Sequence, residues 1–177
     1  MNPQVITLAG GCFWCLEAVY ELCDGVTAVE SGYSNGHVQR PSYQQVCEGD
    51  TGHAEVVRVS FDADRITLRE ILEIFFTIHD PTTRDRQGND VGPQYRSGIY
   101  WEDPAHEAVV REVWAEANRE HRGRVVTELA PLANYWRAED HHQHYFARNP
   151  GQGYCAFVVA PKVEKFRRTF KARVRPA

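Results

Sequence analysis

The sequence predicts an α+β fold in which helices pack against a mixed β-sheet. Two observations favour this class. Short apolar runs typical of strands are mixed along the chain with stretches whose apolar residues recur at helical spacing. Several connections are also long enough to cross over between strands. A chain of 177 residues can bury one sizeable core. We therefore expect residues 1–177 to form a single domain, with residues 155–177 as a C-terminal tail and terminal helix.

Each predicted element follows from a local pattern. Thr67 is a plausible N-cap, and Glu70 completes a capping box there. Pro104 is typical of a helix start, and Gly123 of a helix end. Residues 37–53 look irregular, residues 79–97 form a long charged loop, and residues 154–159 fit a strand or an apolar tail segment. We expect strands at 5–9, 26–33, 54–61, 98–101 and 125–129, and helices at 13–23, 67–78, 104–121, 136–147 and 162–175.

Composition argues against several classes of partner. The net charge is −4 with no basic block, so nucleic acid and anionic membranes are poor candidates. No run approaches the ~18 apolar residues that a membrane span needs. The N-terminus has no basic region before its short apolar run, so we do not interpret it as a signal peptide. Five cysteines, an odd number, favour reduced thiols and a cytoplasmic location.

The most informative stretch is Gly-Gly-Cys-Phe-Trp-Cys-Leu-Glu at 10–17. Cys12 lies where a strand turns into a helix, and the unpaired N–H groups of a helix start favour an anion. We therefore expect Cys12 to ionise readily and to act as a nucleophile. Gly10 and Gly11 allow a close approach from one side. Phe13 and Trp14 place two large apolar rings beside the sulfur.

Two other interpretations of this stretch stay open. Cys12 and Cys15 fit buried apolar thiols, or one half of a zinc site. The cluster His141, His142 and His144, expected on one helix, offers zinc ligands, but a hydrogen-bonded helix face is the better default. The strand–turn–helix setting favours a reactive thiol.

Other candidate residues carry less information individually. Glu55 begins a strand, Tyr33 ends the preceding strand, and Asp90 and Tyr95 lie in the long loop. Each also fits an ordinary surface or half-buried side chain. Cys155 lies beyond the last confident helix, where it can reach another sulfur or be buried beside Phe157. Cys23 and Cys47 fit structural roles.

The stretch at 10–17 and several further blocks of the sequence together resemble the A-type peptide methionine sulfoxide reductases, which act on the S epimer. The resemblance covers about residues 5–155. It implies a two-layer sandwich of ferredoxin-like type, consistent with the α+β prediction. The matching blocks after 10–17 are Ser31-Gly32-Tyr33, Thr51-Gly52-His53-Ala54-Glu55, His79-Asp80-Pro81-Thr82, 87–97 and Ala138-Glu139-Asp140-His141-His142-Gln143.

The resemblance also implies a role for each matching residue. Cys12 is the expected nucleophile, and Glu55 the expected proton donor. In the same pattern Phe13 and Trp14 hold the substrate methyl group, Tyr33 and Tyr95 bind the sulfoxide oxygen, and Asp90 is a further polar residue of the pocket.

The resemblance implies a reaction sequence that repairs oxidised proteins. The Cys12 thiolate attacks the sulfoxide sulfur, methionine leaves, and Cys12 becomes a sulfenic acid. A second cysteine then forms a disulfide, which thioredoxin reduces. The substrate is methionine sulfoxide in proteins or free. No metal or organic cofactor is required, and we expect a monomer.

Two cysteines compete for the resolving role. Cys155 matches the Gly-Tyr-Cys of the family, and we prefer it. However, the glycine-rich tail with a further cysteine that many members carry is replaced here by 156–162, Ala-Phe-Val-Val-Ala-Pro-Lys. Cys15, one turn from Cys12, is the rival. Two rival functions are a thioredoxin-type oxidoreductase using Cys12 and Cys15, and a zinc-binding module.

Overall fold

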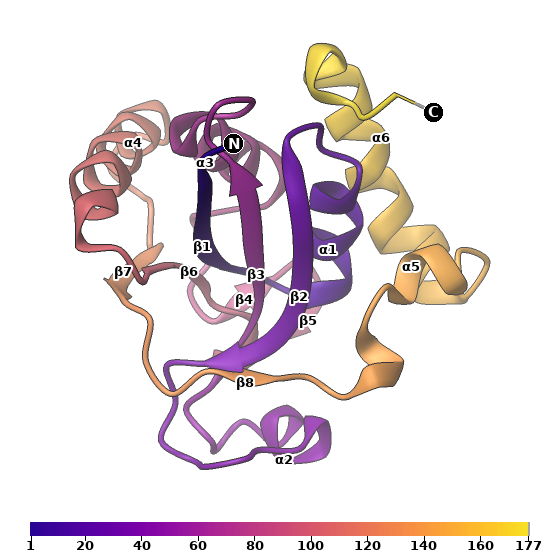
Figure 1. The fold of residues 1–177 in the computed structure, drawn as a ribbon. Coiled ribbons are helices and arrows are strands. Elements are labelled where there is room, and N and C mark those ends of the chain that lie inside the picture. The colour runs from indigo at the N-terminus through magenta and orange to yellow at the C-terminus, as the bar shows by residue number, and fades with distance from the viewer. Residues whose placement is uncertain (177) are drawn as a thin grey trace.

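A computed structural model describes residues 1–176 (Figure 1). A six-stranded sheet runs in the order β7-β6-β1-β3-β2-β8, and a separate hairpin pairs β4 with β5. The strands are β1 (Pro3–Gly10), β2 (Val26–Ser34), β3 (Ala54–Asp62), β4 (Arg86–Gln87), β5 (Asp90–Val91), β6 (Ser97–Trp101), β7 (Glu128–Pro131) and β8 (Trp136–Arg137). The helices are α1 (Phe13–Glu21), α2 (Tyr43–Cys47), α3 (Leu68–Ile78), α4 (Glu107–Glu120), α5 (Tyr145–Arg148) and α6 (Ala160–Thr169).

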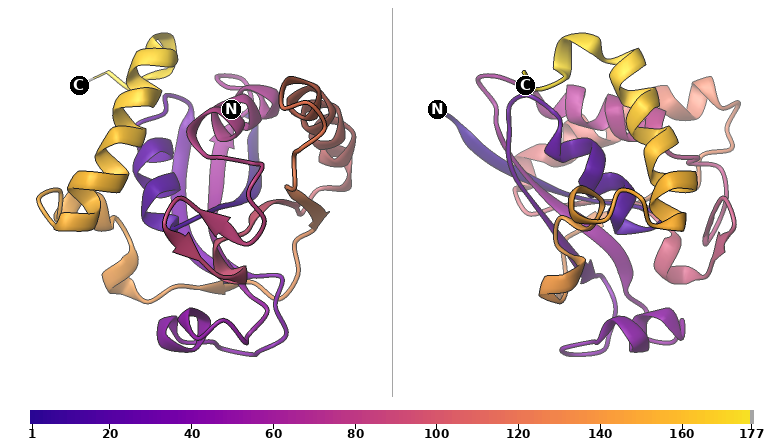
Figure 2. Two further views of the ribbon diagram at one scale, coloured as in Figure 1. Left: turned by 180° about the vertical axis from the view of Figure 1, so that it is seen from behind. Right: turned by 90° about the vertical axis from the view of Figure 1, so that its right-hand side faces the viewer.

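The chain connectivity confirms the α+β prediction. β1, α1, β2, β3, α3 and β6 occur in that order along the chain, with α2 between β2 and β3 and the β4–β5 hairpin between α3 and β6. These four strands pair with one another in antiparallel orientation. This order is compatible with the β-α-β-β-α-β arrangement that the resemblance implies. β7 pairs with β6 in parallel and makes the sheet mixed. Helices α1, α3 and α6 lie together on one side of the sheet (Figure 2).

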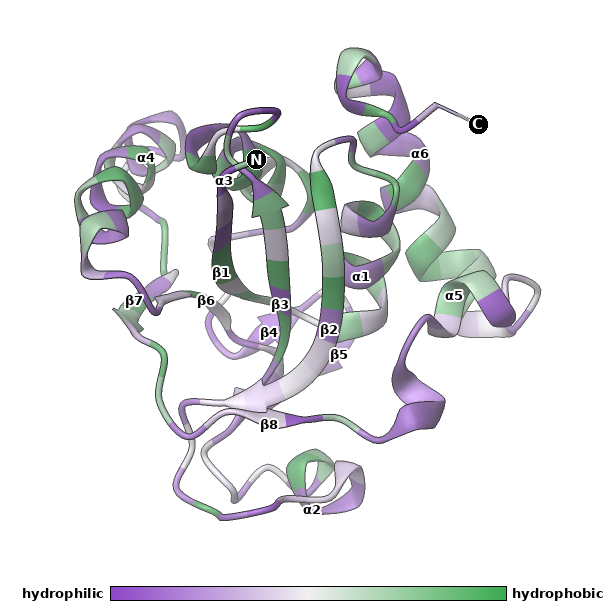
Figure 3. Cartoon of the chain, in the orientation of Figure 1, coloured by the Kyte–Doolittle hydropathy of each residue, from purple (hydrophilic) through white to green (hydrophobic). Residues whose placement is uncertain are grey.

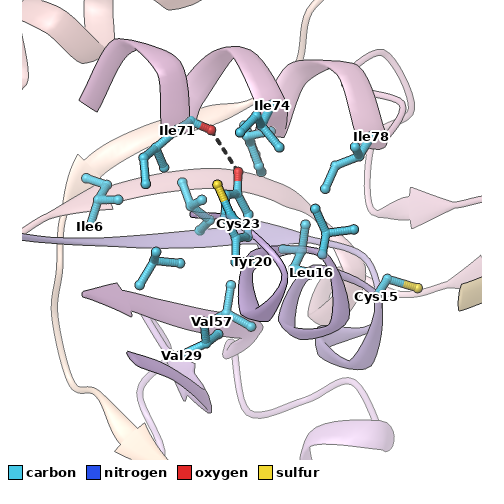
Figure 4. Packing of buried hydrophobic residues seen from close by; sticks show 14 of the residues in the cluster. Ile6, Cys15, Leu16, Tyr20, Cys23, Val29, Val57, Ile71, Ile74 and Ile78 are labelled. Carbon is cyan, nitrogen blue, oxygen red and sulfur yellow. Dashed lines mark hydrogen bonds between the residues drawn. The ribbon is translucent and has the colours of Figure 1, made fainter. Parts of the chain in front are cut away.

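The main core lies between the sheet and these helices. Leu8 faces Val57 across β1 and β3, and both are fully buried. Tyr20 of α1 packs in the same cluster, and its hydroxyl donates a 2.8 Å hydrogen bond to the carbonyl of Ile71 in α3 (Figure 4). This bond satisfies a buried hydroxyl group that would otherwise cost free energy. The core therefore fixes α1, which begins directly after Cys12, against both the sheet and α3.

Several predicted elements are confirmed. The helix start at Thr67 has both hydrogen bonds of its capping box with Glu70. The strands expected at 26–33, 54–61 and 98–101 are observed within one residue of their predicted ends. α4 ends at Glu120, close to the expected end at 121, although a 3₁₀ turn, Pro104–His106, precedes it.

The helix predicted at 136–147 is wrong. Trp136 and Arg137 instead form β8 on the edge of β2, a 3₁₀ turn covers Asp140–His142, and His144 has a positive φ of 55°. The side chain of Gln143 explains this path, because its amide bonds both the N–H and the carbonyl of Ser31 at 2.9 Å. The hydrogen bonds between Gln143 and Ser31 of β2 thus outweigh the helical tendency that the spacing of apolar residues predicts. The segment between β8 and α5 is largely hydrophilic (Figure 3).

Other boundaries also need correction. The irregular region 37–53 contains α2, which Ser42 and Gln45 cap with a complete capping box. The strand expected at 125–129 begins only at Glu128. Residues 155–159 form a π-helical turn rather than a strand, and it runs into α6, which ends at Thr169 and is followed by a 3₁₀ turn. None of the helices within residues 1–176 has the length and apolarity to cross a bilayer.

Candidate active site

Cys12 is the N-cap residue of α1, directly after β1 and Gly11. Its carbonyl accepts the first helical hydrogen bond, from the N–H of Cys15 at 3.1 Å. The side chain is almost enclosed, with 7% of its surface exposed. Burial and the nearby Glu55 raise the pKa of Cys12 well above its ordinary value, and a bond from the Trp14 backbone only partly opposes this. The expectation that Cys12 ionises readily is therefore wrong for the substrate-free protein, because desolvation outweighs the helix start.

Side chains of this protein occupy the space beside Gly10 and Gly11, where the sequence predicted a close approach. A Cβ at Gly11 would lie 2.7 Å from Cγ of Gln87, and the φ of Gly11 is +91°. The amide of Gln87 accepts from the N–H of Asp80 at 2.8 Å and donates to its carbonyl at 2.9 Å. These contacts tie the loop 79–97 to the strand end that carries Cys12.

Glu55, the second residue of β3, is fully buried beside the start of α1. Its Oε1 accepts a hydrogen bond of 3.1 Å from the backbone N–H of Phe13. Its Oε2 has no partner among residues 1–176. Burial raises the pKa of Glu55 to about 8, and the Phe13 bond opposes this shift. A carboxyl group with this pKa keeps its proton at neutral pH and can donate it.

The aromatic residues after Cys12 form one side of the site. Phe13 is fully buried, and its ring centroid lies 5.3 Å from that of His142. Trp14 is half-buried and stacks on Tyr145, with centroids 3.8 Å apart and an interplanar angle of 6°. Its indole N–H donates to Nδ1 of His142 at 3.3 Å, and the ring of Tyr154 meets it edge-on at 5.8 Å. The indole is therefore held by residues outside α1, since it stacks on Tyr145 and also contacts His142 and Tyr154.

The two tyrosines expected at the site, Tyr33 and Tyr95, differ in burial. Tyr33 faces Glu55 across β2 and β3, but it is fully buried and its hydroxyl donates to Glu139 at 2.8 Å. Tyr95 is half-buried, and burial together with Glu55 raises its pKa. Tyr43, which the sequence reasoning missed, is also half-buried, and burial and Glu55 likewise raise its pKa. The signal that could have found Tyr43 is the capping box that starts α2.

A cavity of about 600 Å³ adjoins this site. Asp90 lines it, and Oδ2 of Asp90 accepts a 2.5 Å hydrogen bond from the hydroxyl of Tyr154. This bond joins the β4–β5 hairpin to the segment before α6. Cys12, Cys15 and Lys162 lie in the same wall. Sequence reasoning singled out neither Tyr154 nor Lys162 for the site.

All five thiols are free. Cys155 is fully buried in the apolar cluster that also contains Cys15, and its N–H donates to Oε1 of Gln152 at 3.0 Å. The expected neighbour Phe157 is 84% exposed, so Phe157 does not cover Cys155. Cys47, at the end of α2, is exposed.

The expected histidine cluster does not join the cysteine pair. Within residues 1–176, the one group of side chains close enough to share a metal ion is Glu17, Glu21 and His144. Glu17 is already bonded to the N–H of Tyr145 and the hydroxyl of Ser31, both at 3.1 Å. The rival zinc site built from Cys12 and Cys15 with these histidines therefore has no support in the geometry.

A buried cysteine at a helix start, opposite a carboxyl group that keeps its proton, defines a thiol-based enzyme site on an α+β fold. Comparison with known proteins gives its family. A family model described as peptide methionine sulfoxide reductase matches residues 4–174. The chain belongs to this family and is an oxidoreductase.

Relatives and solved structures agree with this assignment. The chain is 50% identical to peptide methionine sulfoxide reductase MsrA of Ralstonia nicotianae, covering 97% of this chain and 93% of that protein. It is 46% identical to MsrA of Thermus thermophilus, covering 99% of this chain and all of that protein. Reduced Mxr1 from Saccharomyces cerevisiae superposes with a TM-score of 0.83 at 39% identity, covering 87% of this chain and 90% of Mxr1. A structure of Mxr1 in complex with Trx2 is also similar, with a TM-score of 0.59 at 29% identity, covering 81% and 85%.

Proposed function

We propose that this enzyme reduces the S epimer of methionine sulfoxide, free or within proteins, to methionine, and so repairs oxidised proteins. One observation carries the proposal. One carboxyl oxygen of Glu55, next to Cys12, has no partner among residues 1–176, and burial raises the pKa of this carboxyl group to about 8. A sulfoxide is a poor electrophile until its oxygen is hydrogen-bonded or protonated, and Glu55 supplies that proton.

The reaction moves one oxygen atom onto Cys12. Cys12 is a thiol in the substrate-free protein, so it first gives its proton to solvent. Its thiolate then attacks the sulfoxide sulfur while the carboxyl proton of Glu55 moves to the oxygen. The bond between the two sulfurs then breaks as the hydroxyl moves from the substrate sulfur to the Cys12 sulfur, which leaves a sulfenic acid on Cys12 and releases methionine. The substrate sulfur is reduced and the Cys12 sulfur is oxidised by the same two electrons.

The surrounding side chains bind the substrate. Phe13 and Trp14 provide an apolar wall for the S-methyl group. The hydroxyl of Tyr95 binds the sulfoxide oxygen, and Asp90 adds a polar contact. The sequence also predicted that Tyr33 binds the sulfoxide oxygen, but its hydroxyl already donates to Glu139. We therefore propose Tyr43 as the second hydroxyl donor. Such donors stabilise charge as it grows on an oxygen in the transition state.

A second cysteine and an external dithiol complete the cycle. The sequence pattern favours Cys155 as the second cysteine, with Cys15 as the rival. We propose thioredoxin as the reductant, supported by the similarity to Mxr1 in its complex with Trx2. Five free thiols fit a reducing compartment, and we propose that the enzyme works as a monomer in the cytoplasm.

Turnover of the separated epimers tests the proposal. We expect the wild type, supplied with a dithiol, to reduce S-methionine sulfoxide and leave the R epimer unchanged. Cys12→Ser should abolish the reaction. Turnover of neither epimer, or turnover that survives in Cys12→Ser, would contradict the proposal. Reduction of a protein disulfide in the absence of sulfoxide would favour the thioredoxin-type rival.

A further inference from the structure

The cavity beside Cys12 is larger than the reacting groups require. Its volume of about 600 Å³ lies within the range of about 300–1,000 Å³ that holds drug-sized ligands, so a single methionine sulfoxide side chain fills only part of it. Helix α6, which packs against α1 (Figure 1), and the turn before it supply one wall. This wall, here called the α6 wall, is formed by Phe157, Val158, Pro161, Lys162 and Lys165. The remaining space can therefore receive residues that flank the sulfoxide in a protein substrate.

We propose that the α6 wall selects oxidised protein segments in which an acidic residue lies close in sequence to the methionine sulfoxide, and that Lys162 and Lys165 bind its carboxylate. The inference rests on the proposed function and names the class of substrate that the same site prefers. Lys162 and Lys165 are specificity residues, and neither takes part in the chemistry at Cys12.

The two lysines present their charges on one face of α6. They are three residues apart, so their side chains are neighbours on the helix surface, and both line the cavity. Lys162 is half-buried and Lys165 is exposed. Burial raises the pKa of the Cys15 thiol to about 11, and the ammonium group of Lys162 opposes this shift. The charge of Lys162 therefore acts inside the cavity.

The two ammonium groups are not neutralised by the protein itself. Within residues 1–176, neither lysine forms an ion pair with an acidic side chain. Asp90, the carboxylate that lines the cavity, already accepts a 2.5 Å hydrogen bond from the hydroxyl of Tyr154. The chain as a whole carries a net charge of −4, so this pair of cations is a local reversal of charge. Such a surface attracts a negative partner and disfavours a positive one.

The apolar residues of the α6 wall suit an extended peptide. The side chain of Phe157 is almost fully exposed, and Val91, which directly follows Asp90 in the β4–β5 hairpin, is exposed as well. Exposed apolar side chains gain free energy when a partner covers them. Apolar contact with Phe157 would hold a peptide irrespective of its charge. The lysines then distinguish acidic from basic residues beside the sulfoxide.

Competition between peptides tests the proposal. Three peptides of equal length, acetylated and amidated at their ends, carry S-methionine sulfoxide flanked by glutamate, glutamine or lysine. They are mixed in equal excess with the enzyme for a single turnover without reductant, so that contacts with thioredoxin cannot contribute. At low ionic strength we expect the glutamate peptide to be reduced about threefold to tenfold more than the glutamine peptide, and the lysine peptide least. The preference should largely disappear in about 1 M salt.

Charge variants assign the preference to the α6 wall. Lys165→Glu should invert it, so that the lysine peptide becomes the better substrate, and this gain also shows that the variant is folded. Lys162→Gln should weaken the preference for glutamate. Lys171→Glu is the matched control, because it changes the net charge by the same amount but lies after α6 and outside the cavity wall. Its preference should remain that of the wild type.

Several results would overturn the inference while leaving the proposed function intact. One is equal reduction of the three peptides by the wild type. Another is a preference that survives unchanged in Lys165→Glu and Lys162→Gln. A third is a preference for N-acetylmethionine sulfoxide over its amide with none among the peptides, which would assign the lysines to the α-carboxylate of the free compound. Failure to reduce any of these sulfoxides would instead remove the proposed function, and this inference with it.

Discussion

The backbone N–H of Phe13 donates a 3.1 Å hydrogen bond to Oε1 of Glu55, which leaves Oε2 without a partner among the described residues. The bond comes from the first residue of α1, directly after the Cys12 thiol. It therefore fixes the direction of a buried carboxyl group relative to the nucleophile. The free oxygen is the position from which Glu55 can give its proton to a substrate.

Glu55→Gln should remove the proton donor and keep the shape of the site. Since a general acid contributes about 10²–10⁴-fold, we expect methionine release to slow by that factor, with a smaller change in substrate binding. Single-turnover kinetics with the S epimer measure both. Glu48→Gln, an exposed carboxylate after α2, is the control. A Glu55→Gln enzyme with the wild-type rate would exclude Glu55 as the donor.

The pH dependence of the rate of methionine release should reveal the ionisation of Glu55. A donor whose pKa lies near 8 is protonated below that pH and loses its proton above it. The Cys12 thiol ionises only above its ordinary pKa, so the thiolate fraction also rises with pH in this range. We therefore expect the rate of methionine release to rise with pH up to about 8 and to show a flat limb above it, where loss of the Glu55 proton offsets the gain in thiolate. Glu55→Gln should lack this limb. If the limb persists in the variant, another group is responsible.

The free energy of unfolding should fall as pH rises, because burial raises the pKa of Glu55 in the folded protein. Its pKa is raised from 4.5 to about 8, so between these values the folded protein holds a proton that the unfolded chain has lost. Raising pH through this window should therefore lower the free energy of unfolding, by up to about 1.4 kcal/mol per pH unit from this group. Urea unfolding from pH 5 to 8 measures the slope, and Glu55→Gln should make it less negative. An unchanged slope would contradict the prediction.

Phenylalanine variants distinguish the two tyrosines near Glu55. Tyr43→Phe should lower kcat/KM by about 10²-fold if its hydroxyl stabilises the sulfoxide oxygen. Tyr33→Phe should cost about 1 kcal/mol of stability, because Glu139 loses a hydrogen-bond donor. Steady-state kinetics and urea unfolding of both variants provide the measurement. A larger kinetic loss in Tyr33→Phe would restore the role that the sequence assigned to it.

Gly11→Ala should disturb the strand end before Cys12. A Cβ there would lie 2.7 Å from Gln87, and the φ of +91° disfavours any side chain. We expect a loss of about 1–3 kcal/mol in the free energy of unfolding. Gly151→Ala, where a Cβ would meet nothing within 4 Å, should be close to neutral. Equal stability of the two variants would show that the loop 79–97 adjusts freely.

Local patterns in the sequence determined much of the fold and part of the site. The change from strand to helix around Cys12 and the capping box of Thr67 and Glu70 both involve neighbours in the chain, so a local pattern predicts them correctly. The same holds for the alternation of strands and helices that gave the α+β class. The family blocks further identified the nucleophile candidate and the carboxyl group that faces it, because both lie in short conspicuous motifs.

Only the tertiary structure decided the features that depend on distant contacts. Gln143 hydrogen-bonds to Ser31, and the predicted helix does not form. Glu139 accepts a hydrogen bond from the hydroxyl of Tyr33, so this hydroxyl is not available to a substrate. Burial raises the pKa of Cys12 where a helix start alone predicts the reverse. Lys162 reaches the cavity of Cys15 from more than a hundred residues away along the chain. Burial and long-range hydrogen bonds depend on packing, and no local pattern of residues contains that information.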